Sequence, residues 1–340
     1  MKQNKILGCC YGAAYGDSLG AVTESCLRSE ILQAFPNECL DYAESISRLT
    51  EGIFPGQVTD DFGSSLYFIK AILRHDGKFN RGIAVEAILD WSQDEIVFGR
   101  YAGQNSKNAI ERLRQGIIIE KESVRSHFAR RNTNGGAMKV SPVALLAKTL
   151  DEAVDYALDL CWPTHYNSAA AAGAAAIACA VWQAQQTAST MDSLIEAGIY
   201  GARTARMRLE KEGMTAQGPY VDRKIKDAVE TIKEAADYPS LVVCLNESIG
   251  MKSIVQESVP AVFAIIAACH GDFKQSIRCA VNAGGDTDTV ASMIGAILGS
   301  RYGLTVIDEK TILRIQEANE FLKLKETIEA YTNLIMKRGY

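Results

Sequence analysis

The sequence predicts an all-α protein, and three observations support that prediction. Apolar residues recur at helical spacing, as Leu66, Ile69 and Leu73 do. Residues 169–176 are all alanine apart from one glycine, a composition that favours a buried helix. A regular alternation of strands and helices is absent, and residues 242–245 form at most a short strand. Because no internal repeat or linker interrupts the chain, we expect one compact domain over residues 1–340.

The helices expected in the first third of the chain each have a local signal. Glycines at every fourth position from 12 to 20 leave one helix face bare, which favours close helix packing. Thr59 or Asp60 can cap the helix that carries the apolar stripe at 66–73. A shorter stripe predicts a further helix over residues 84–91.

Helical signals continue through the middle of the chain. Pro142 suits the first turn of a helix, so we expect one over residues 143–150. The spacing of apolar residues over 153–160 predicts the next. The alanine-rich segment has almost no side-chain bulk, so neighbouring helices can approach it closely, and we place it at the centre of the bundle.

Three more helices are expected in the last third. Residues 259–270 predict a buried helix with Pro260 in its first turn. Residues 290–300 predict another, with small residues on its faces. Apolar positions among charged ones make 312–328 an amphipathic helical pattern.

Composition excludes several classes of protein. Hydrophobic residues make up 47% of the chain, which suffices for a large core, and the net charge of -5 gives no basic footprint for nucleic acid. No apolar run is long enough to span a membrane, and no signal peptide is evident. The nine cysteines show no metal-binding spacing, so we expect reduced thiols in a cytoplasmic protein.

Two acidic motifs suggest chemistry. The first is Thr59-Asp60-Asp61, which by itself is explained by a capped helix start. The second runs from Asn282 through Gly284, Gly285, Asp286, Asp288 and Thr289. It lies between apolar stretches, where carboxylates are costly unless something pairs with them. We therefore favour metal binding for the second motif.

The two motifs together offer enough oxygen ligands for a pair of ions. Neither can close a site alone, but jointly they supply four carboxylates and two hydroxyls. Mg²⁺ prefers such ligands, and Mn²⁺ accepts them too. We therefore predict a two-metal centre, which requires the motifs to meet in space. The predicted ligands are Thr59, Asp60, Asp61, Asp286, Asp288 and Thr289.

Other candidates carry weaker signals. Glu24 follows the glycine-spaced helix and can project into a cleft, although its position alone favours a solvated glutamate. The glycine turn before Pro142 has backbone amides that suit a phosphate, and it contains Gly135, Gly136, Ala137 and Met138. His165 precedes the alanine helix, where a structural role is the commoner one. Tyr101 or Phe98 can stack on a base.

The ordered set of motifs resembles the ADP-ribosylglycohydrolase family over most of the chain. In order they are 16–20 with Glu24, 59–61, 135–138, 164–165 and 284–289. The resemblance implies an all-α orthogonal bundle with two Mg²⁺ or Mn²⁺ ions held by the six residues named above. It implies a catalytic or metal-neighbouring role for Glu24, an ADP-ribose loop at 135–138, and His165, Gly284 and Gly285 beside the substrate.

Three departures accompany the resemblance. Phe62 stands where the family commonly has a second threonine, and Lys139 where its glycine loop usually ends in arginine. The stretch 99–108 lacks the acidic residue of arginine-directed members, which argues against ADP-ribosyl-arginine as substrate. The metal motifs themselves are intact.

The resulting hypothesis is hydrolysis of a glycosidic bond to ADP-ribose, with Glu24 or Asp61 accepting the proton of the attacking water. The substrate is then an ADP-ribosylated protein or small molecule, without nucleic acid or membrane as partner. One alternative is a nucleosidase-like hydrolase of a smaller ribosyl or phosphoribosyl substrate. Another, from a different class, is a catalytically idle, crystallin-like structural relative.

Overall fold

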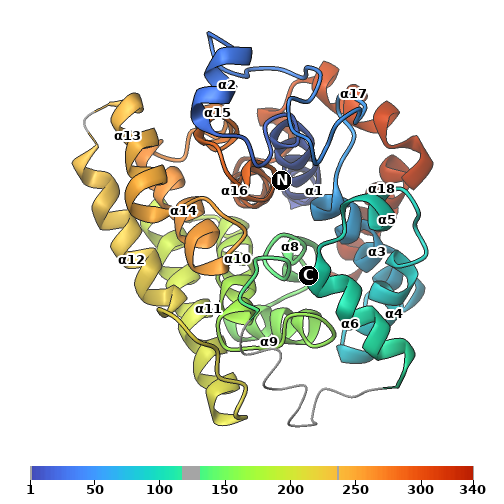
Figure 1. Cartoon of the computed structure of the whole chain (residues 1–340). Helices are drawn as coiled ribbons and strands as arrows, with labels where there is room; N and C mark the ends of the chain where they lie inside the picture. The colour runs from blue at the N-terminus through green and yellow to red at the C-terminus, as the bar shows by residue number, and fades with distance from the viewer. Residues whose placement is uncertain (1, 117–130, 236, 340) are drawn as a thin grey trace.

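The computed structural model describes residues 2–116, 131–235 and 237–339, and over these it is all-helical (Figure 1). No β-strand occurs in these ranges, and one isolated bridge joins Thr133 to Ile254. The predicted all-α class is therefore confirmed. No described helix is long and apolar enough to cross a membrane. The single-domain assignment stays a prediction.

The helices follow one another with short connections in most of the chain. Those before residue 117 are α1 (Lys2–Gly20), α2 (Arg28–Ala34), α3 (Asp60–Arg74), α4 (Arg81–Trp91), α5 (Val97–Tyr101) and α6 (Gln104–Arg114). The middle helices are α8 (Ser141–Ala144), α9 (Leu150–Cys161), α10 (Ala170–Ala184), α11 (Met191–Lys211), α12 (Val221–Thr231) and α13 (Tyr238–Cys244). The last are α14 (Val255–Ala268), α15 (Phe273–Ala283), α16 (Thr287–Tyr302), α17 (Glu309–Ala318) and α18 (Leu324–Arg338).

The first helix and α16 lie side by side at an unusually close approach (Figure 1). A methyl group added at Gly12 would lie 2.2 Å from the carbonyl oxygen of Gly295, and one added at Gly16 would lie 2.1 Å from that of Ala291. Real side chains do not reach such distances, so only glycine fits there. The predicted close-packed glycine face is confirmed, and it aligns the C-terminal end of α1 with the start of α16.

The alanine-rich helix α10 is buried over almost its whole length. It packs against α9, α11, α14 and α16, and Gly201 of α11 approaches the carbonyl of Ala175. A helix without long side chains accepts neighbours on every side, which explains its central position. The expectation for this segment is confirmed.

Several predicted boundaries are wrong. Residues 242–245 lie in α13 and in a π-helical turn at Leu245–Ile249, so they form no strand. The helix expected over 143–150 is the single turn α8, because the chain turns before α9 begins at Leu150.

Two further predictions for the last third also need correction. The helix α14 starts five residues before Pro260, so that proline lies inside the helix rather than in its first turn. The pattern at 312–328 belongs to two helices, because Lys323 adopts a left-handed conformation with φ of 53° between them.

Candidate metal centre

The start of α3 is attached to α1 by a buried carboxylate, Asp17. Its side chain accepts hydrogen bonds from the Thr59 amide at 2.9 Å, the Thr59 hydroxyl at 2.8 Å and the Phe62 amide at 2.8 Å. Helix N-termini present free amide donors, and Asp17 satisfies two of them from another helix. This contact fixes the Thr59-Asp60-Asp61 motif beside α1.

The start of α16 joins the same place from the other end of the sequence. The Thr289 hydroxyl donates to Asp61, at 3.0 and 3.2 Å from its two carboxylate oxygens. Thr287 donates to the carbonyl of Gly20 at 2.9 Å, which holds the helix start against the end of α1. The two acidic motifs, 59–61 and 286–289, therefore meet.

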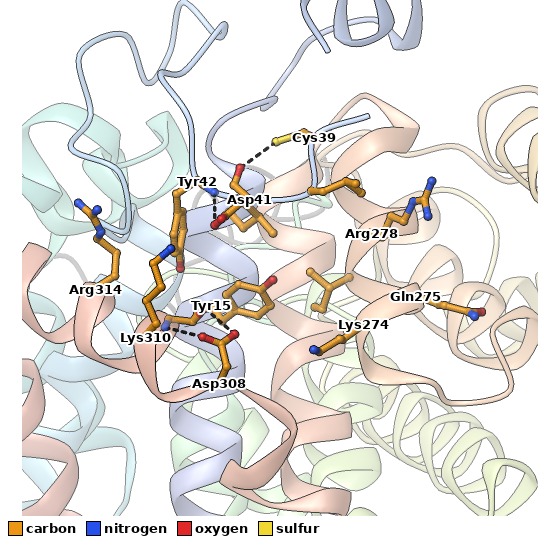
Figure 2. A pocket seen from close by; sticks show the side chains of 14 residues that line it. Tyr15, Cys39, Asp41, Tyr42, Lys274, Gln275, Arg278, Asp308, Lys310 and Arg314 are labelled. Atoms are coloured by element: carbon orange, nitrogen blue, oxygen red, sulfur yellow. Dashed lines mark hydrogen bonds between the residues drawn. The ribbon is translucent and has the colours of Figure 1, made fainter. Parts of the chain in front are cut away.

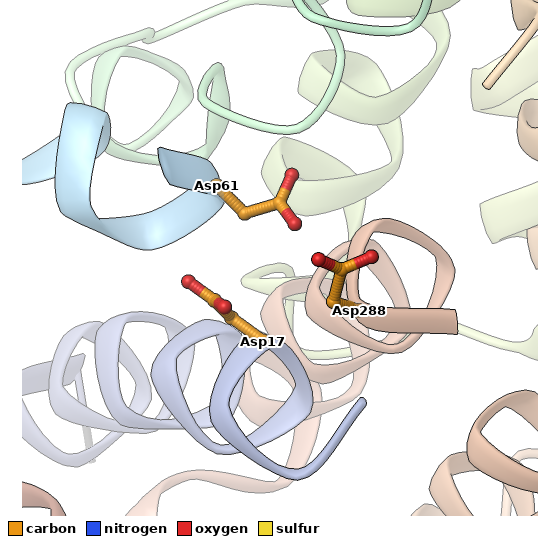
Figure 3. Close-up of side chains that lie close together, drawn as sticks. All are labelled: Asp17, Asp61 and Asp288. Atoms are coloured by element: carbon orange, nitrogen blue, oxygen red, sulfur yellow. The ribbon is translucent and has the colours of Figure 1, made fainter. Parts of the chain in front are cut away.

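Carboxylates from three helices converge at this junction (Figure 3). Asp17, Asp61 and Asp288 each offer an oxygen, and these oxygens lie within 4.8 Å of one another. Asp288, Asp286 and Glu24 form a second such group with the same spread. Asp288 belongs to both groups, so the two share an edge. We call these five residues and Asp60 the acidic cluster.

Backbone geometry at the glycine pair brings Asp286 to the cluster. Gly284 and Gly285 have φ of 88° and 82°, values that side-chain-bearing residues rarely adopt. The Asp286 amide then donates to the Met251 carbonyl at 2.6 Å, and its carboxylate accepts from the Asn134 side chain at 2.5 Å. The two glycines thus permit the turn that precedes Asp286.

The acidic cluster is electrostatically unfavourable without a cation. Burial, together with neighbouring carboxylates, raises the pKa of Glu24 to about 8. Burial raises the pKa of Asp60 to about 7, and that of Asp17 to about 6 despite its hydrogen bonds. Burial and nearby carboxylates raise the pKa values of Asp61 and Asp288 well above their usual range. Groups this costly to ionise call for a compensating positive charge.

One cation, Lys139, is buried near the cluster. Its ammonium has no hydrogen-bond partner among the described residues and lies 5.3 Å from the centre of the Trp91 ring. Burial lowers the pKa of Lys139 to about 8, although the charge of Asp60 opposes that shift. A single lysine cannot balance six carboxyl groups, so most of the negative charge stays uncompensated by the chain.

A pocket of about 760 Å³ opens beside the cluster. Glu24, Gly285 and Asp286 form one side of it, and the 246–253 segment forms another. Its volume lies in the range of sites for cofactor-sized ligands. Of the two predicted proton acceptors, Glu24 lines this pocket, whereas Asp61 is fully buried behind it.

The predicted ADP-ribose turn and His165 lie next to each other, and both are hydrogen-bonded within the protein. The amides of Ala137 and Met138 donate to the Asn134 carbonyl, at 2.7 and 3.1 Å. These two amides are therefore engaged within the turn and do not point to a phosphate. His165 is buried beneath this turn, with its ring nitrogens 2.7 Å from the Thr164 hydroxyl and 3.1 Å from the Thr133 hydroxyl. Burial keeps the pKa of His165 well below its usual value, so the ring is neutral.

Tyr101 lies at the end of α5, and its hydroxyl is buried without a hydrogen-bond partner among the described residues. Burial raises the pKa of Tyr101 to about 12, with a smaller contribution from Asp17, Glu24 and Asp60. The hydroxyl therefore stays protonated and can donate a hydrogen bond, and the negative charges of the acidic cluster favour this form.

Sequence reasoning missed two members of this site. Asp17 is not among the predicted site residues, although its carboxylate holds the start of α3. Asn134 directly precedes the predicted turn at 135–138 and is not among the predicted site residues, although its side chain donates to Asp286. Asp17 had one usable signal, since it lies between Gly16 and Gly20, where a closely packed helix face leaves little room for an unpaired charge.

The comparisons with known proteins agree with this fold. The family model described as ADP-ribosylglycohydrolase matches residues 1–339. The chain belongs to this family.

Individual relatives extend over nearly the whole chain. The protein YegU of Escherichia coli is 28% identical over 336 residues, which is 94% of both chains. ADP-ribosylhydrolase ARH3 of Mus musculus is 24% identical and covers 90% of this chain and 86% of its own. A solved structure described as an ADP-ribosylglycohydrolase-related protein complex superposes with a TM-score of 0.64 at 20% identity, covering 98% of this chain and 99% of that one.

Proposed function

We propose that this protein is a metal-dependent glycosidase that hydrolyses the bond between ADP-ribose and an acceptor. The observation that carries the proposal is the acidic cluster itself, in which carboxylates from two distant motifs converge at a pocket. Family membership supports an ADP-ribosyl substrate, as does the similarity to ADP-ribosylhydrolase ARH3.

The donor set fits two hard divalent cations. Carboxylate and hydroxyl oxygens are the ligands that Mg²⁺ and Mn²⁺ prefer. The hydroxyls of Thr59 and Thr289 each give their proton to a carboxylate, so neither needs its proton elsewhere. The Thr59 oxygen also accepts the Asp61 amide at 3.4 Å, which leaves it one lone pair for an ion. When bound, the ions would supply Lewis-acid activation of water and substrate. The proposed ligands are Thr59, Asp60, Asp61, Asp286, Asp288 and Thr289.

Asp17 and Asn134 would act by positioning these ligands. Asp17 already accepts three hydrogen bonds from the start of α3, which leaves it little capacity for an ion. Asn134 donates to one oxygen of Asp286 and so orients that carboxylate. Mutating a residue that hydrogen-bonds to a metal ligand typically lowers metal affinity about 10- to 100-fold.

Glu24 is the proposed proton acceptor. It lies at the pocket wall and is partly exposed, so a water molecule entering the pocket can reach its carboxylate. Asp61 is less suitable, because it is buried and its carboxylate accepts the Thr289 hydroxyl. A base within reach of the attacking water contributes about 10²- to 10⁴-fold to the rate.

The surrounding residues suit a ribosyl transition state. Positive charge grows on the ribose ring as its glycosidic bond breaks, and the nearby carboxylates stabilise that charge. Gly285 removes side-chain bulk from the pocket wall, so the substrate can approach the backbone closely. The free hydroxyl of Tyr101 would donate to substrate, while Gly135, Gly136 and His165 would shape the wall behind Asn134.

The structure favours an active enzyme over an idle relative. Collecting buried carboxylates costs stability, and a purely structural protein gains nothing from it. The same site can also hydrolyse a smaller ribosyl substrate. An assay must therefore distinguish the ADP-ribosyl hydrolase from the nucleosidase-like hydrolase.

The test is a turnover assay with Mg²⁺ on peptides carrying ADP-ribose on serine or arginine, with inosine as the nucleoside control. We expect release of free ADP-ribose, measured by liquid chromatography, and loss of release in EDTA. Glu24→Gln should lower kcat about 100-fold or more. Glu196→Gln, an exposed site on α11, makes the same change away from the pocket and should leave kcat unchanged.

Each contrary result has a defined meaning. Full activity in EDTA contradicts the metal mechanism. Cleavage of inosine alone favours the nucleosidase-like alternative. Silence on all substrates, with Mg²⁺ still bound, supports the idle relative.

A further inference from the structure

A second pocket lies between α1, α15 and α17, apart from the acidic cluster (Figure 2). Its volume is about 590 Å³, and Tyr15 and Tyr42 form part of its wall. None of the residues that line it belongs to the acidic cluster. The proposed hydrolysis takes place at the acidic cluster and does not involve this pocket. The residues that line the pocket therefore need a separate explanation.

The pocket is flanked by two pairs of basic residues. Lys274 and Arg278 lie one turn apart on α15, and Lys310 and Arg314 lie one turn apart on α17 (Figure 2). Like charges at this spacing destabilise a helix by about 0.2–0.5 kcal/mol a pair. Two such pairs on either side of one pocket, in a chain of net charge -5, indicate selection for an anion.

The acidic residues of this pocket are already engaged by the backbone. Asp308 caps α17 by accepting the amide and the hydroxyl of Thr311, both at 2.9 Å. Asp41 accepts the amide of Tyr42 at 2.8 Å. Four cations therefore line the pocket with two carboxylates, and one of the cations, Arg278, is also paired with Glu38. A smaller excess of positive charge remains.

Two of the four cations and one hydroxyl remain available to a ligand. Arg278 pairs with Glu38 at 2.6 Å, and Arg314 lies 5.8 Å from the centre of the Phe54 ring. Lys274 and Lys310 make no hydrogen bond or close ion pair within the described ranges. The Thr311 hydrogen bonds lower the pKa of Asp308, and the charge of Lys274 adds a smaller contribution. The Tyr15 ring is held between Phe273 and Tyr42, at centroid distances of 6.1 and 6.2 Å, so its hydroxyl is fixed at the pocket.

We propose that this pocket is a second ligand site, which binds a small phosphate-bearing anion between Lys274 and Lys310. A phosphate group presents oxygens in tetrahedral directions and can accept from both walls at once, whereas a carboxylate presents a single planar edge. The Tyr15 hydroxyl supplies a neutral donor, and Arg278 and Arg314 extend the positive field at the rim.

The test is calorimetric titration of the full chain with inorganic pyrophosphate in EDTA, where the metal-free acidic cluster repels anions. Lys274→Gln combined with Lys310→Gln should weaken binding about tenfold, since each lysine donates a charge-assisted hydrogen bond. Lys325→Gln combined with Lys337→Gln removes the same charge from exposed positions of α18 and should leave the affinity within about twofold.

Citrate, a carboxylate anion, provides the second arm and should bind at least tenfold more weakly than pyrophosphate. Absence of pyrophosphate binding to the unmodified chain would overturn the proposal, as would equal weakening in the two double variants. Equal affinity for citrate would overturn the assignment to phosphate.

Discussion

The Thr289 hydroxyl donates to the Asp61 carboxylate at 3.0 Å, across 228 residues of sequence. This hydrogen bond joins the first turn of α16 to the first turn of α3. Both residues are proposed metal ligands, so the contact orients one ligand by means of another. The acidic cluster therefore forms a single unit rather than two adjacent helix starts.

Replacing Thr289 tests that unit. Thr289→Val keeps the shape but removes the hydroxyl, so it should lower Mg²⁺ affinity about 10- to 100-fold and reduce turnover with it. Mg²⁺ titration followed by thermal unfolding measures the affinity. Thr332→Val is the control, because its hydroxyl is also buried and donates to the Ile328 carbonyl far from the cluster. Equal Mg²⁺ affinity in both variants would contradict the ligand assignment.

The contact between α1 and α16 predicts a large cost for one added methyl group. Gly12→Ala would place its Cβ 2.2 Å from the Gly295 carbonyl oxygen, so the helices must separate. We expect a loss of about 1–3 kcal/mol in the free energy of unfolding. Urea denaturation measures it.

Gly99→Ala provides the comparison. It lies in the short helix α5 and meets only the Asp94 carbonyl, at 3.9 Å. Its free energy of unfolding should change by less than about 1 kcal/mol. Equal stability of the two variants would show that the helices are not in contact as described.

The raised carboxyl pKa values predict an unusual pH dependence in EDTA. The pKa is raised to about 8 for Glu24, about 7 for Asp60 and about 6 for Asp17, chiefly by burial. The folded chain therefore binds more protons than the unfolded chain, and stability is lost as pH rises through these values. The Tm in EDTA should fall between pH 5 and 8.

Saturating Mg²⁺ should reduce this fall in Tm with pH, because bound cations stabilise the ionised carboxylates. Parallel thermal scans with EDTA and with Mg²⁺ measure the difference. Identical curves in the two buffers would show that these carboxylates do not bind the ion.

We expect Lys139→Met to increase the stabilisation of the chain by Mg²⁺. The substitution removes a buried positive charge near Asp60 while keeping similar length. The negative potential of the cluster then grows, and it acts on a divalent ion twice as strongly as on a competing proton. The rise in Tm on adding Mg²⁺ should exceed that of the unmodified chain. The exposed Lys325→Met should show the unmodified response, and a smaller rise in Lys139→Met would refute the argument.

Much of the fold could be predicted because its signals are local. The Thr59 cap, the glycine spacing of α1 and the alanine content of α10 each determine a helix from neighbouring residues. The helix after Pro142 is shorter than expected, although the proline does lie in its first turn. The boundary near Pro260 was wrong because proline fits a helix start and, less often, a helix interior. Only packing decides between these cases.

The sequence by itself determined the helical class and the two acidic motifs, because periodicity and residue type are properties of short segments. Only the tertiary structure decided that Asp17 and Asn134 support those motifs, that Glu24 rather than Asp61 lines the pocket, and that four cations flank a second one. Such relationships depend on the packing of helices that are far apart in the sequence, as α1 and α16 are.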